Sequence, residues 1–135
     1  MTSKDVRPSL GLARLPDAAR YSLAGLCHAA RHEAAFRQEL LGAVVLTSLA
    51  IVLPVGLLEK LLLVLSMLFV LVVELLNSAI EATVDRISTE RHPLSGQAKD
   101  LGSAAVAIAL LMSALSWLAI AGPVLVTWLH ALPAP

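Results

Sequence analysis

The sequence is poor in the charged and aromatic residues on which soluble domains and membrane barrels depend. Only 15% of its 135 residues are charged and 4% are aromatic, whereas 58% are hydrophobic. The mean hydropathy is +0.81. A soluble domain of this length rarely reaches such values, and a membrane barrel would show alternating hydrophobicity and aromatic girdles. The composition therefore predicts a small all-α membrane protein.

Several other features that the sequence lacks limit the classes of function it can have. The formal net charge is zero, so nothing in the composition indicates nucleic acid as a partner. Cys27 is the single cysteine and cannot form an internal disulfide. Met1–Arg20 is polar and lacks the apolar region of a signal peptide. The sequence contains no GxxxxGK[ST] motif, so any use of ATP would not depend on a P-loop.

Three stretches are long and apolar enough to cross a bilayer, and we expect spans at 40–58, 60–87 and 99–122. The first has 19 uncharged residues, which as a helix cover about 28 Å, close to the thickness of a hydrocarbon core. A proline and a glycine near its end should shorten it, and Gly122–Pro123 should kink or end the third span. Residues 17–39 mix charged and apolar side chains, which predicts an amphipathic helix in the interface plane or a soluble juxtamembrane helix.

Lysine and arginine are unevenly distributed around these spans. Six precede residue 40, one lies between the first two spans, three lie between the second and third, and none follows Lys99. The positive-inside rule places the N-terminus and the second loop in the cytoplasm and the C-terminus on the opposite side. We therefore expect the amphipathic helix, the second loop and the end of the second span to meet at the cytoplasmic surface.

A polar stripe follows the apolar half of the second span. Glu74 comes directly after the uncharged run 61–73, and Asn77, Glu81 and Asp85 follow at helical spacing on the same face. A charged group at membrane depth costs at least about 2.5–3.5 kcal/mol, so Glu74 is a candidate for function. Three spans offer few inward positions for such a stripe. We therefore infer a homo-oligomer in which it faces a neighbour or a cleft between subunits.

The charged residues near the expected cytoplasmic surface favour phosphoryl transfer. Acidic side chains there can bind a hard cation such as Mg²⁺, which prefers oxygen ligands: Glu33, Glu39, Glu81 and Asp85. Basic side chains nearby can hold phosphate oxygens: Arg86, Arg91 and Lys99. Together with a carboxylate at lipid depth, they indicate transfer of a phosphoryl group to a lipid hydroxyl, which needs mainly positioning and charge neutralisation.

Each of these residues also has a structural interpretation. Asn77 can join helices by hydrogen bonding, and Glu33 can pair with Arg37 one helical turn away. Asp85 can pair with an arginine, and the arginines near the second loop can act as topology determinants. Glu74 is the residue whose structural explanation is weakest, because its cost in the membrane is largest.

A histidine pair within 17–39 is a weaker candidate for a metal site. His28 and His32 are four residues apart and share a helical face. A metal usually needs more ligands than two, so a solvated face is favoured.

Two functions without phosphoryl transfer are also compatible with the polar stripe. One is a small transporter or proton-translocating subunit, in which Glu74 and Glu81 relay protons. The second is a structural helper subunit, in which the stripe only joins helices.

Three segments carry motifs in a characteristic order: EAAFRQE at 33–39, VELLNSAIEATVDR at 73–86 and LSGQAKDLGSAAV at 94–106. Together they resemble the motifs of the prokaryotic membrane-integral diacylglycerol kinases, over about residues 14–111. The resemblance implies transfer of the γ-phosphate of ATP to the hydroxyl of diacylglycerol, giving phosphatidate. It also implies a homotrimeric bundle in the bacterial inner membrane, with active sites shared between subunits.

The resemblance implies roles for individual residues as well. Glu74 matches the general base, and Glu33 and Glu81 match the carboxylates that hold Mg²⁺ with the nucleotide phosphates. Further implied nucleotide contacts are Arg14, Tyr21, Glu90, Arg91, His92, Lys99 and Asp100. Implied lipid contacts, beside Glu74, are Ala35, Phe36, Arg37, Gln38, Glu39, Asn77 and Ser103.

Two departures from the family pattern bear on the acceptor. Leu23 stands where some relatives have an interfacial tryptophan, which affects lipid anchoring more than chemistry. The segment 91–94, RHPL, is similar to the loop of the related undecaprenol kinases, so a polyprenol acceptor is the alternative within the same fold. The motif at 33–39 favours diacylglycerol.

Overall fold

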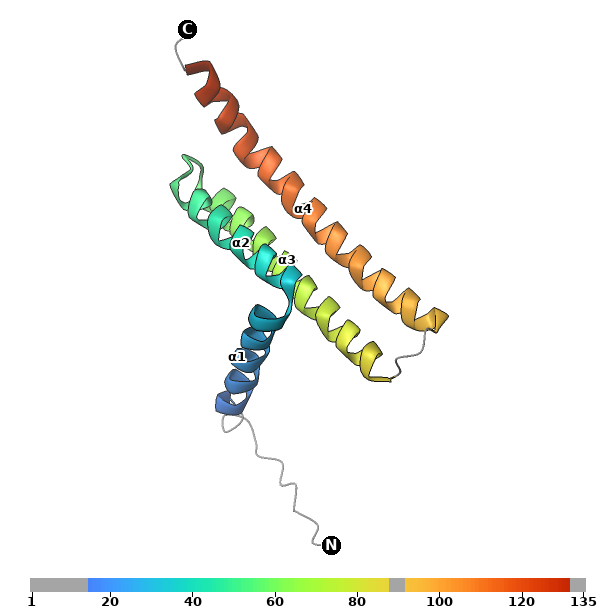
Figure 1. Cartoon of the computed structure of the whole chain (residues 1–135). Helices are drawn as coiled ribbons and strands as arrows, with labels where there is room; N and C mark the ends of the chain where they lie inside the picture. The colour runs from blue at the N-terminus through green and yellow to red at the C-terminus, as the bar shows by residue number, and fades with distance from the viewer. Residues whose placement is uncertain (1–14, 88–91, 132–135) are drawn as a thin grey trace, which may run out of the picture.

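The computed structural model describes residues 15–87 and 92–131, and within them all regular structure is α-helical (Figure 1). The helices are α1 (Leu15–His32), α2 (Ala34–Val52), α3 (Leu57–Ile87) and α4 (Pro93–Ala131). Three of them, α2, α3 and α4, are long and apolar enough to cross a membrane. The predicted all-α membrane architecture is therefore confirmed.

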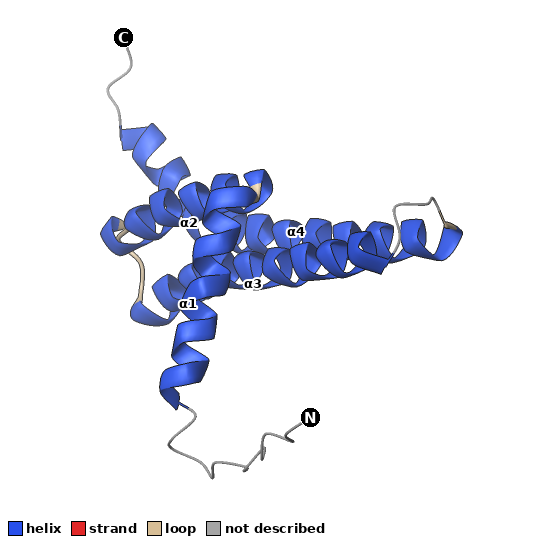
Figure 2. Ribbon diagram, turned by 60° about the horizontal axis from the view of Figure 1, so that its bottom comes forward, coloured by secondary structure: helices blue, strands red, loops and turns tan. Residues whose placement is uncertain are grey.

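The central element is α3, which packs along α4 on one side and against α2 on the other. The helices α3 and α4 are antiparallel. Gly102 faces Asn77, whereas Ser113, which is later on α4, faces Ser66 and Met67, which are earlier on α3. Helix α1 contacts α2 and projects away from the bundle (Figures 1 and 2). This arrangement gathers the end of α1, the start of α2 and the polar half of α3 in one region.

The amphipathic helix expected at 17–39 is in fact two helices. The chain is extended at Glu33, with φ −96° and ψ 115°, and α2 begins at the next residue. The Arg37 guanidinium donates a hydrogen bond of 3.1 Å to the carbonyl of Arg31, which satisfies one of the free carbonyls at the end of α1. The single helix expected at 17–39 is interrupted here because the break depends on the contact between α1 and α2. The helix that carries the first expected span begins at Ala34.

The turn between α2 and α3 is closed by side chains on the first turn of α3. The Gly56 N–H donates to Glu59 Oε2 over 2.7 Å, and the Lys60 ammonium donates to the carbonyl of Ile51 over 2.6 Å. These bonds satisfy groups that the two helix ends leave without helical partners. Since α2 ends at Val52, just before Pro54, the first span is shortened as the proline predicts.

Helix α4 is longer than the span expected at 99–122. It begins at Pro93 and continues through Pro123 to Ala131, whereas the sequence predicts a kink or an end at Gly122–Pro123. Proline lacks an N–H and usually interrupts a helix. Here the residues on both sides keep helical geometry, and the Thr127 hydroxyl donates to the carbonyl of Pro123 over 2.9 Å. A helix of 39 residues is about 58 Å long, so α4 exceeds the roughly 30 Å of a hydrocarbon core.

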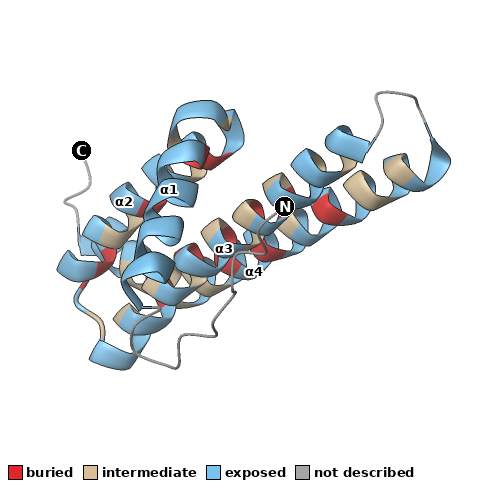
Figure 3. Cartoon of the chain, turned by 90° about the horizontal axis from the view of Figure 1, so that it is seen from below, coloured by how far each residue is buried: buried red, intermediate tan, exposed pale blue. Residues whose placement is uncertain are grey.

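The single chain buries few of its described residues (Figure 3). The two ends of the bundle bury different kinds of side chain. Near the α2–α3 turn, Ala50, Leu53 and Leu63 are buried and form an apolar cluster against α4. Further along α3 the buried residues include Glu74 and Asn77, which are only 5% and 9% exposed. Many large apolar side chains of the spans are exposed in the single chain, as expected for surfaces that meet lipid or another helix.

Candidate active site

A cavity of about 310 Å³ lies where the polar half of α3 meets the α1–α2 junction and the start of α4. Its lining residues are Glu33, Ala35, Glu74, Asn77, Ser78, Glu81, Ser103 and Val106. All but Ser78 and Val106 are among the site residues predicted from the sequence. The fold therefore brings together residues from three separate motifs around one space.

Two local features place the carboxylates in this cavity. Glu74 and Glu81 are seven residues apart on α3, so they point to the same side of the helix. Glu33 reaches the cavity from the extended residue between α1 and α2. Its expected partner in a structural role, Arg37, bonds to α1 instead, and no Glu33–Arg37 ion pair occurs in the described parts of the chain.

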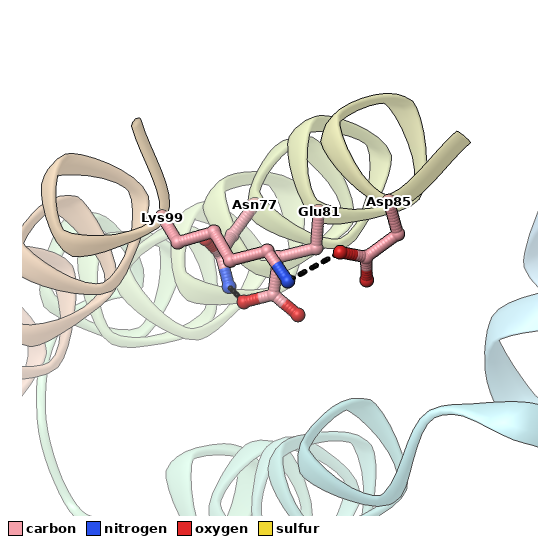
Figure 4. A network of polar contacts seen from close by, with 4 residues as sticks. All are labelled: Asn77, Glu81, Asp85 and Lys99. Carbon is pink, nitrogen blue, oxygen red and sulfur yellow. Dashed lines mark hydrogen bonds and ion pairs between the residues drawn. The ribbon is translucent and has the colours of Figure 1, made fainter. Parts of the chain in front are cut away.

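The electrostatics of the cavity are dominated by negative charge. The charged side chains that line it among the described residues are those of Glu33, Glu74 and Glu81, and all three are acidic. The one side-chain hydrogen bond among the cavity residues that the structure describes runs from Asn77 Nδ2 to Glu81 Oε1, over 3.1 Å (Figure 4). Carboxylates that share a partly buried cavity are stabilised by a proton or a bound cation.

Lys99 lies beside the cavity and reaches from α4 to the end of α3. Its ammonium is 2.6 Å from Asp85 Oδ1 (Figure 4), so Asp85 pairs with a lysine, and within residues 15–87 and 92–131 it forms no ion pair with an arginine. The side chains of Lys99 and Asp85 are 38% and 66% exposed. This ion pair is therefore accessible to a ligand that approaches the surface between the two helices.

The other predicted lipid contacts on α2 differ in environment. Phe36 is buried, Arg37 caps α1 and Gln38 is exposed. Glu39 is half-buried, and its Oε2 has no hydrogen-bond partner among residues 15–87 and 92–131. Of this group only Ala35 lines the cavity.

The predicted nucleotide contacts are spread more widely. Tyr21 is exposed on α1, and the Arg20 guanidinium lies 5.5 Å from the centre of its ring. His92 Nδ1 accepts a hydrogen bond of 3.2 Å from the Leu94 N–H, and Asp100 is exposed on α4. The remaining predicted contacts lie outside the described residues: Arg14, Glu90 and Arg91.

The donor set suits magnesium without forming a complete metal site. The part of the chain that the structure describes contains no group of three or more His, Cys, Asp or Glu side chains arranged to hold a metal. Glu33 and Glu81 nevertheless supply carboxylate oxygens to one cavity, and Mg²⁺ is commonly held by one or two carboxylates together with substrate phosphates and water. The exposed rings of His28 and His32 lie 4.6 Å apart, in agreement with a solvated face.

A larger notch that was not predicted adjoins the carboxylate cavity. It has a volume of about 580 Å³, lies between α1 and α3, and shares Glu33 and Ser78 with the cavity. Its remaining lining residues are mostly small or apolar: Ser22, Gly25, Leu26, His28, Ala29, Leu75, Ala79 and Ala82. Small residues at helical spacing are a sequence signal for close helix approach. Only the fold, however, brings these two stretches together.

Comparison with known proteins identifies the family. Residues 20–121 match the model of the prokaryotic diacylglycerol kinase family. The chain belongs to this family. It is 51% identical to the diacylglycerol kinase of Pseudomonas aeruginosa over 117 residues, which cover 87% of this chain and 95% of the relative. It is 49% identical to the diacylglycerol kinase of Escherichia coli (strain K12) over 107 residues, which cover 79% and 88% of the two chains.

Family membership confirms the resemblance drawn from the three motifs and the class of activity. The chain is a lipid kinase, a multi-pass bacterial membrane enzyme with ATP as co-substrate. This excludes the transporter and the structural helper subunit as explanations of the polar stripe. The carboxylate cavity on α3 is accordingly the candidate active site of the kinase.

Proposed function

We propose that this kinase transfers the γ-phosphate of ATP to the primary hydroxyl of diacylglycerol, giving phosphatidate. The observation that carries the proposal is the meeting of Glu33, Glu74 and Glu81 at one cavity beside an apolar notch. The relatives named diacylglycerol kinase, at 43–51% identity, support the choice of acceptor.

Glu74 is the general base in this proposal. Its carboxylate is buried on a membrane-spanning helix, at the depth that a lipid hydroxyl reaches more easily than a water-soluble alcohol. It takes the hydroxyl proton while the hydroxyl oxygen bonds to the γ-phosphorus. The bond from that phosphorus to the bridging oxygen breaks, and ADP leaves. A positioned base contributes about 10²–10⁴-fold to such a step.

Glu33 and Glu81 would hold Mg²⁺ together with the nucleotide phosphates. When bound, the metal supplies charge neutralisation to the transferred phosphoryl group. The nucleotide itself approaches from the surface where Lys99 and Asp85 meet, because this part of the chain is exposed beside the cavity. The proposed nucleotide contacts are Arg14, Tyr21, Glu90, Arg91, His92, Lys99 and Asp100.

The lipid occupies the side of the cavity toward α1. The notch between α1 and α3 is lined mainly by small and apolar residues, which suits acyl chains. Since Glu33 and Ser78 line both spaces, a lipid with its chains in the notch presents its hydroxyl toward Glu74. The proposed lipid contacts are Ala35, Phe36, Arg37, Gln38, Glu39, Glu74, Asn77 and Ser103.

The active enzyme is a homotrimer in this proposal, with sites shared between subunits. Tyr21 supports sharing, because it is exposed on a helix that projects from the bundle and does not line the cavity of its own chain. The many exposed apolar side chains on α2 and α4 offer surfaces for neighbouring copies. The distribution of lysine and arginine supports a cytoplasmic N-terminus and second loop, and a C-terminus on the opposite side.

The test is phosphate transfer by the purified full-length protein in mixed micelles, with radiolabelled ATP, Mg²⁺ and either diacylglycerol or undecaprenol. We expect labelled phosphatidate from the wild type and a loss of about 10²–10⁴-fold in turnover for Glu74→Gln, because the base is removed. The thermal midpoint and oligomeric state of this variant should match the wild type.

The matched control is Glu59→Gln. Glu59 lies on the same helix, outside the cavity, and glutamine keeps an oxygen that can accept the Gly56 N–H. Turnover of Glu74→Gln within a few-fold of the control would refute the base role. Transfer to undecaprenol alone would change the acceptor while keeping the site and its chemistry.

A further inference from the structure

Gly102 of α4 lies directly against Asn77, one of the residues of the polar stripe of α3. It is buried, and a Cβ atom built on it would overlap Asn77 Oδ1 and lie 3.2 Å from Asn77 Cγ. The nearest atoms to this position outside its own helix turn all belong to Asn77. The missing side chain of Gly102 therefore makes the space that the Asn77 amide occupies.

The Asn77 amide is oriented by its hydrogen bond to Glu81. Its NH₂ group is the donor and Glu81 Oε1 the acceptor. This turns Oδ1 toward Gly102, where it is buried and has no hydrogen-bond partner among the residues that the structure describes. An unpaired buried oxygen costs free energy. The hydrogen bond of 3.1 Å between the NH₂ group and Glu81 Oε1 offsets part of this cost.

We propose that Gly102 is a positioning residue for the nucleotide side of the active site. By leaving room for the Asn77 amide between α3 and α4, it keeps the Glu81 carboxylate turned into the cavity shared with Glu33. The proposal rests on the proposed function, in which Glu81 binds the metal that accompanies ATP. Partners that orient a metal ligand commonly affect affinity or activity by about 10–100-fold when they are removed.

Gly102 differs in this respect from other glycines of the chain. A Cβ atom added at Gly122, on the same helix, meets nothing within 4 Å, and the same holds for Gly42 on α2. At Gly102 the obstacle is the end of a side chain, which can move without displacing the backbone. Substitution there should therefore displace the Asn77 amide and free the Glu81 carboxylate while the helices stay in place.

The test compares Gly102→Ala with Gly122→Ala in the full-length protein. We expect Gly102→Ala to raise KM for MgATP about 10-fold or more with a smaller change in kcat, because nucleotide binding and not the base is affected. Affinity for Mn²⁺, measured by electron paramagnetic resonance with a non-hydrolysable ATP analogue, should fall by a similar factor. Gly122→Ala should match the wild type in both measurements.

A double variant separates positioning from helix packing. Asn77→Ala keeps only a Cβ atom, which lies at an ordinary contact distance of 3.8 Å from a Cβ at residue 102. We therefore expect Asn77→Ala and Asn77→Ala/Gly102→Ala to bind Mn²⁺ within about twofold of each other, since residues that act through one contact are not additive. A purely structural role would instead lower affinity in both backgrounds.

Two results would overturn the proposal. One is a Gly102→Ala protein that retains wild-type KM and Mn²⁺ affinity. The second is a loss on Gly102→Ala that is equally large in the Asn77→Ala background, which would assign Gly102 to the spacing of α3 and α4. If the wild type transferred no phosphate, the proposed function would be rejected. The role of Gly102 would still be tested, because the Mn²⁺ affinities of the single and double variants do not depend on phosphate transfer.

Discussion

The two ends of the α2–α3–α4 bundle use similar helices but bury different residues. At the α2–α3 turn, Ala50, Leu53 and Leu63 are buried together. At the opposite end α3 buries Glu74 and Asn77 around a cavity. Close packing stabilises membrane helices, whereas a charged group at membrane depth destabilises them. The contrast indicates that close packing at the apolar end offsets the cost of burying the polar residues of the candidate active site.

After the loss of turnover expected for Glu74→Gln, the largest effect that would sharpen this comparison is expected at the carboxylates proposed to bind the metal. Glu81→Gln and Glu33→Gln should each lower the apparent affinity for Mg²⁺ by about 10–100-fold, because a charged oxygen ligand is lost. The measurement is a Mg²⁺ titration of lipid phosphorylation, and Glu59→Gln is the control. If both variants gave the same Mg²⁺ titration as the control, the metal would not bind in this cavity.

A smaller effect of a different kind is expected at the apolar end. Leu63 is fully buried, and Leu63→Ala should lower the free energy of unfolding by about 2 kcal/mol, because its packing contacts are lost. Unfolding in a denaturing detergent, measured by circular dichroism, checks this value. Turnover per folded enzyme should stay close to wild type.

The exposed Leu58 on the same helix is the control for this prediction, since Leu58→Ala leaves no buried space. If Leu63→Ala abolished turnover while the enzyme stayed folded, the division between a stabilising end and a reactive end would be wrong.

The ion pair at the polar end offers a third test. Lys99→Met should raise KM for ATP about tenfold, since a charge-assisted contact to phosphate is lost. Asp85→Asn removes the same ion pair from the resting enzyme but leaves the lysine in place, so KM should be unchanged or lower. Steady-state kinetics with varied ATP measures both. Equal increases in KM for the two variants would make the pair structural.

The smallest effect is expected in the middle of the bundle. The Ser113 hydroxyl lies 3.2 Å from the Ser66 hydroxyl and 3.1 Å from Met67 Sδ, and so joins α3 to α4. Ser113→Ala should lower the free energy of unfolding by about 0.6 kcal/mol, the average for a hydrogen bond between membrane helices. Ser116→Ala is the control, because the Ser116 hydroxyl bonds to the carbonyl of Met112 on its own helix. A loss no larger than the control would show that this contact contributes nothing.

The sequence by itself determined the class of protein, its three spans and most of the residues around the cavity. Hydropathy is additive along a segment, and the offsets from Glu74 to Asn77 and Glu81 translate directly into one helical face. The motifs indicated Glu33 and Ser103 as well, although they are far from Glu74 in the sequence. These features depend on local geometry or on resemblance, so they could be predicted without the fold.

Only the tertiary structure decided how these elements end and meet. The extended residue at Glu33, the continuation of α4 through Pro123 and the notch between α1 and α3 all differ from or go beyond what local patterns predict. The same is true of the contact between Gly102 and Asn77. Each of these features depends on which helix lies opposite. The neighbours of a residue in the sequence do not identify the opposite helix, because packing between helices depends on the whole fold.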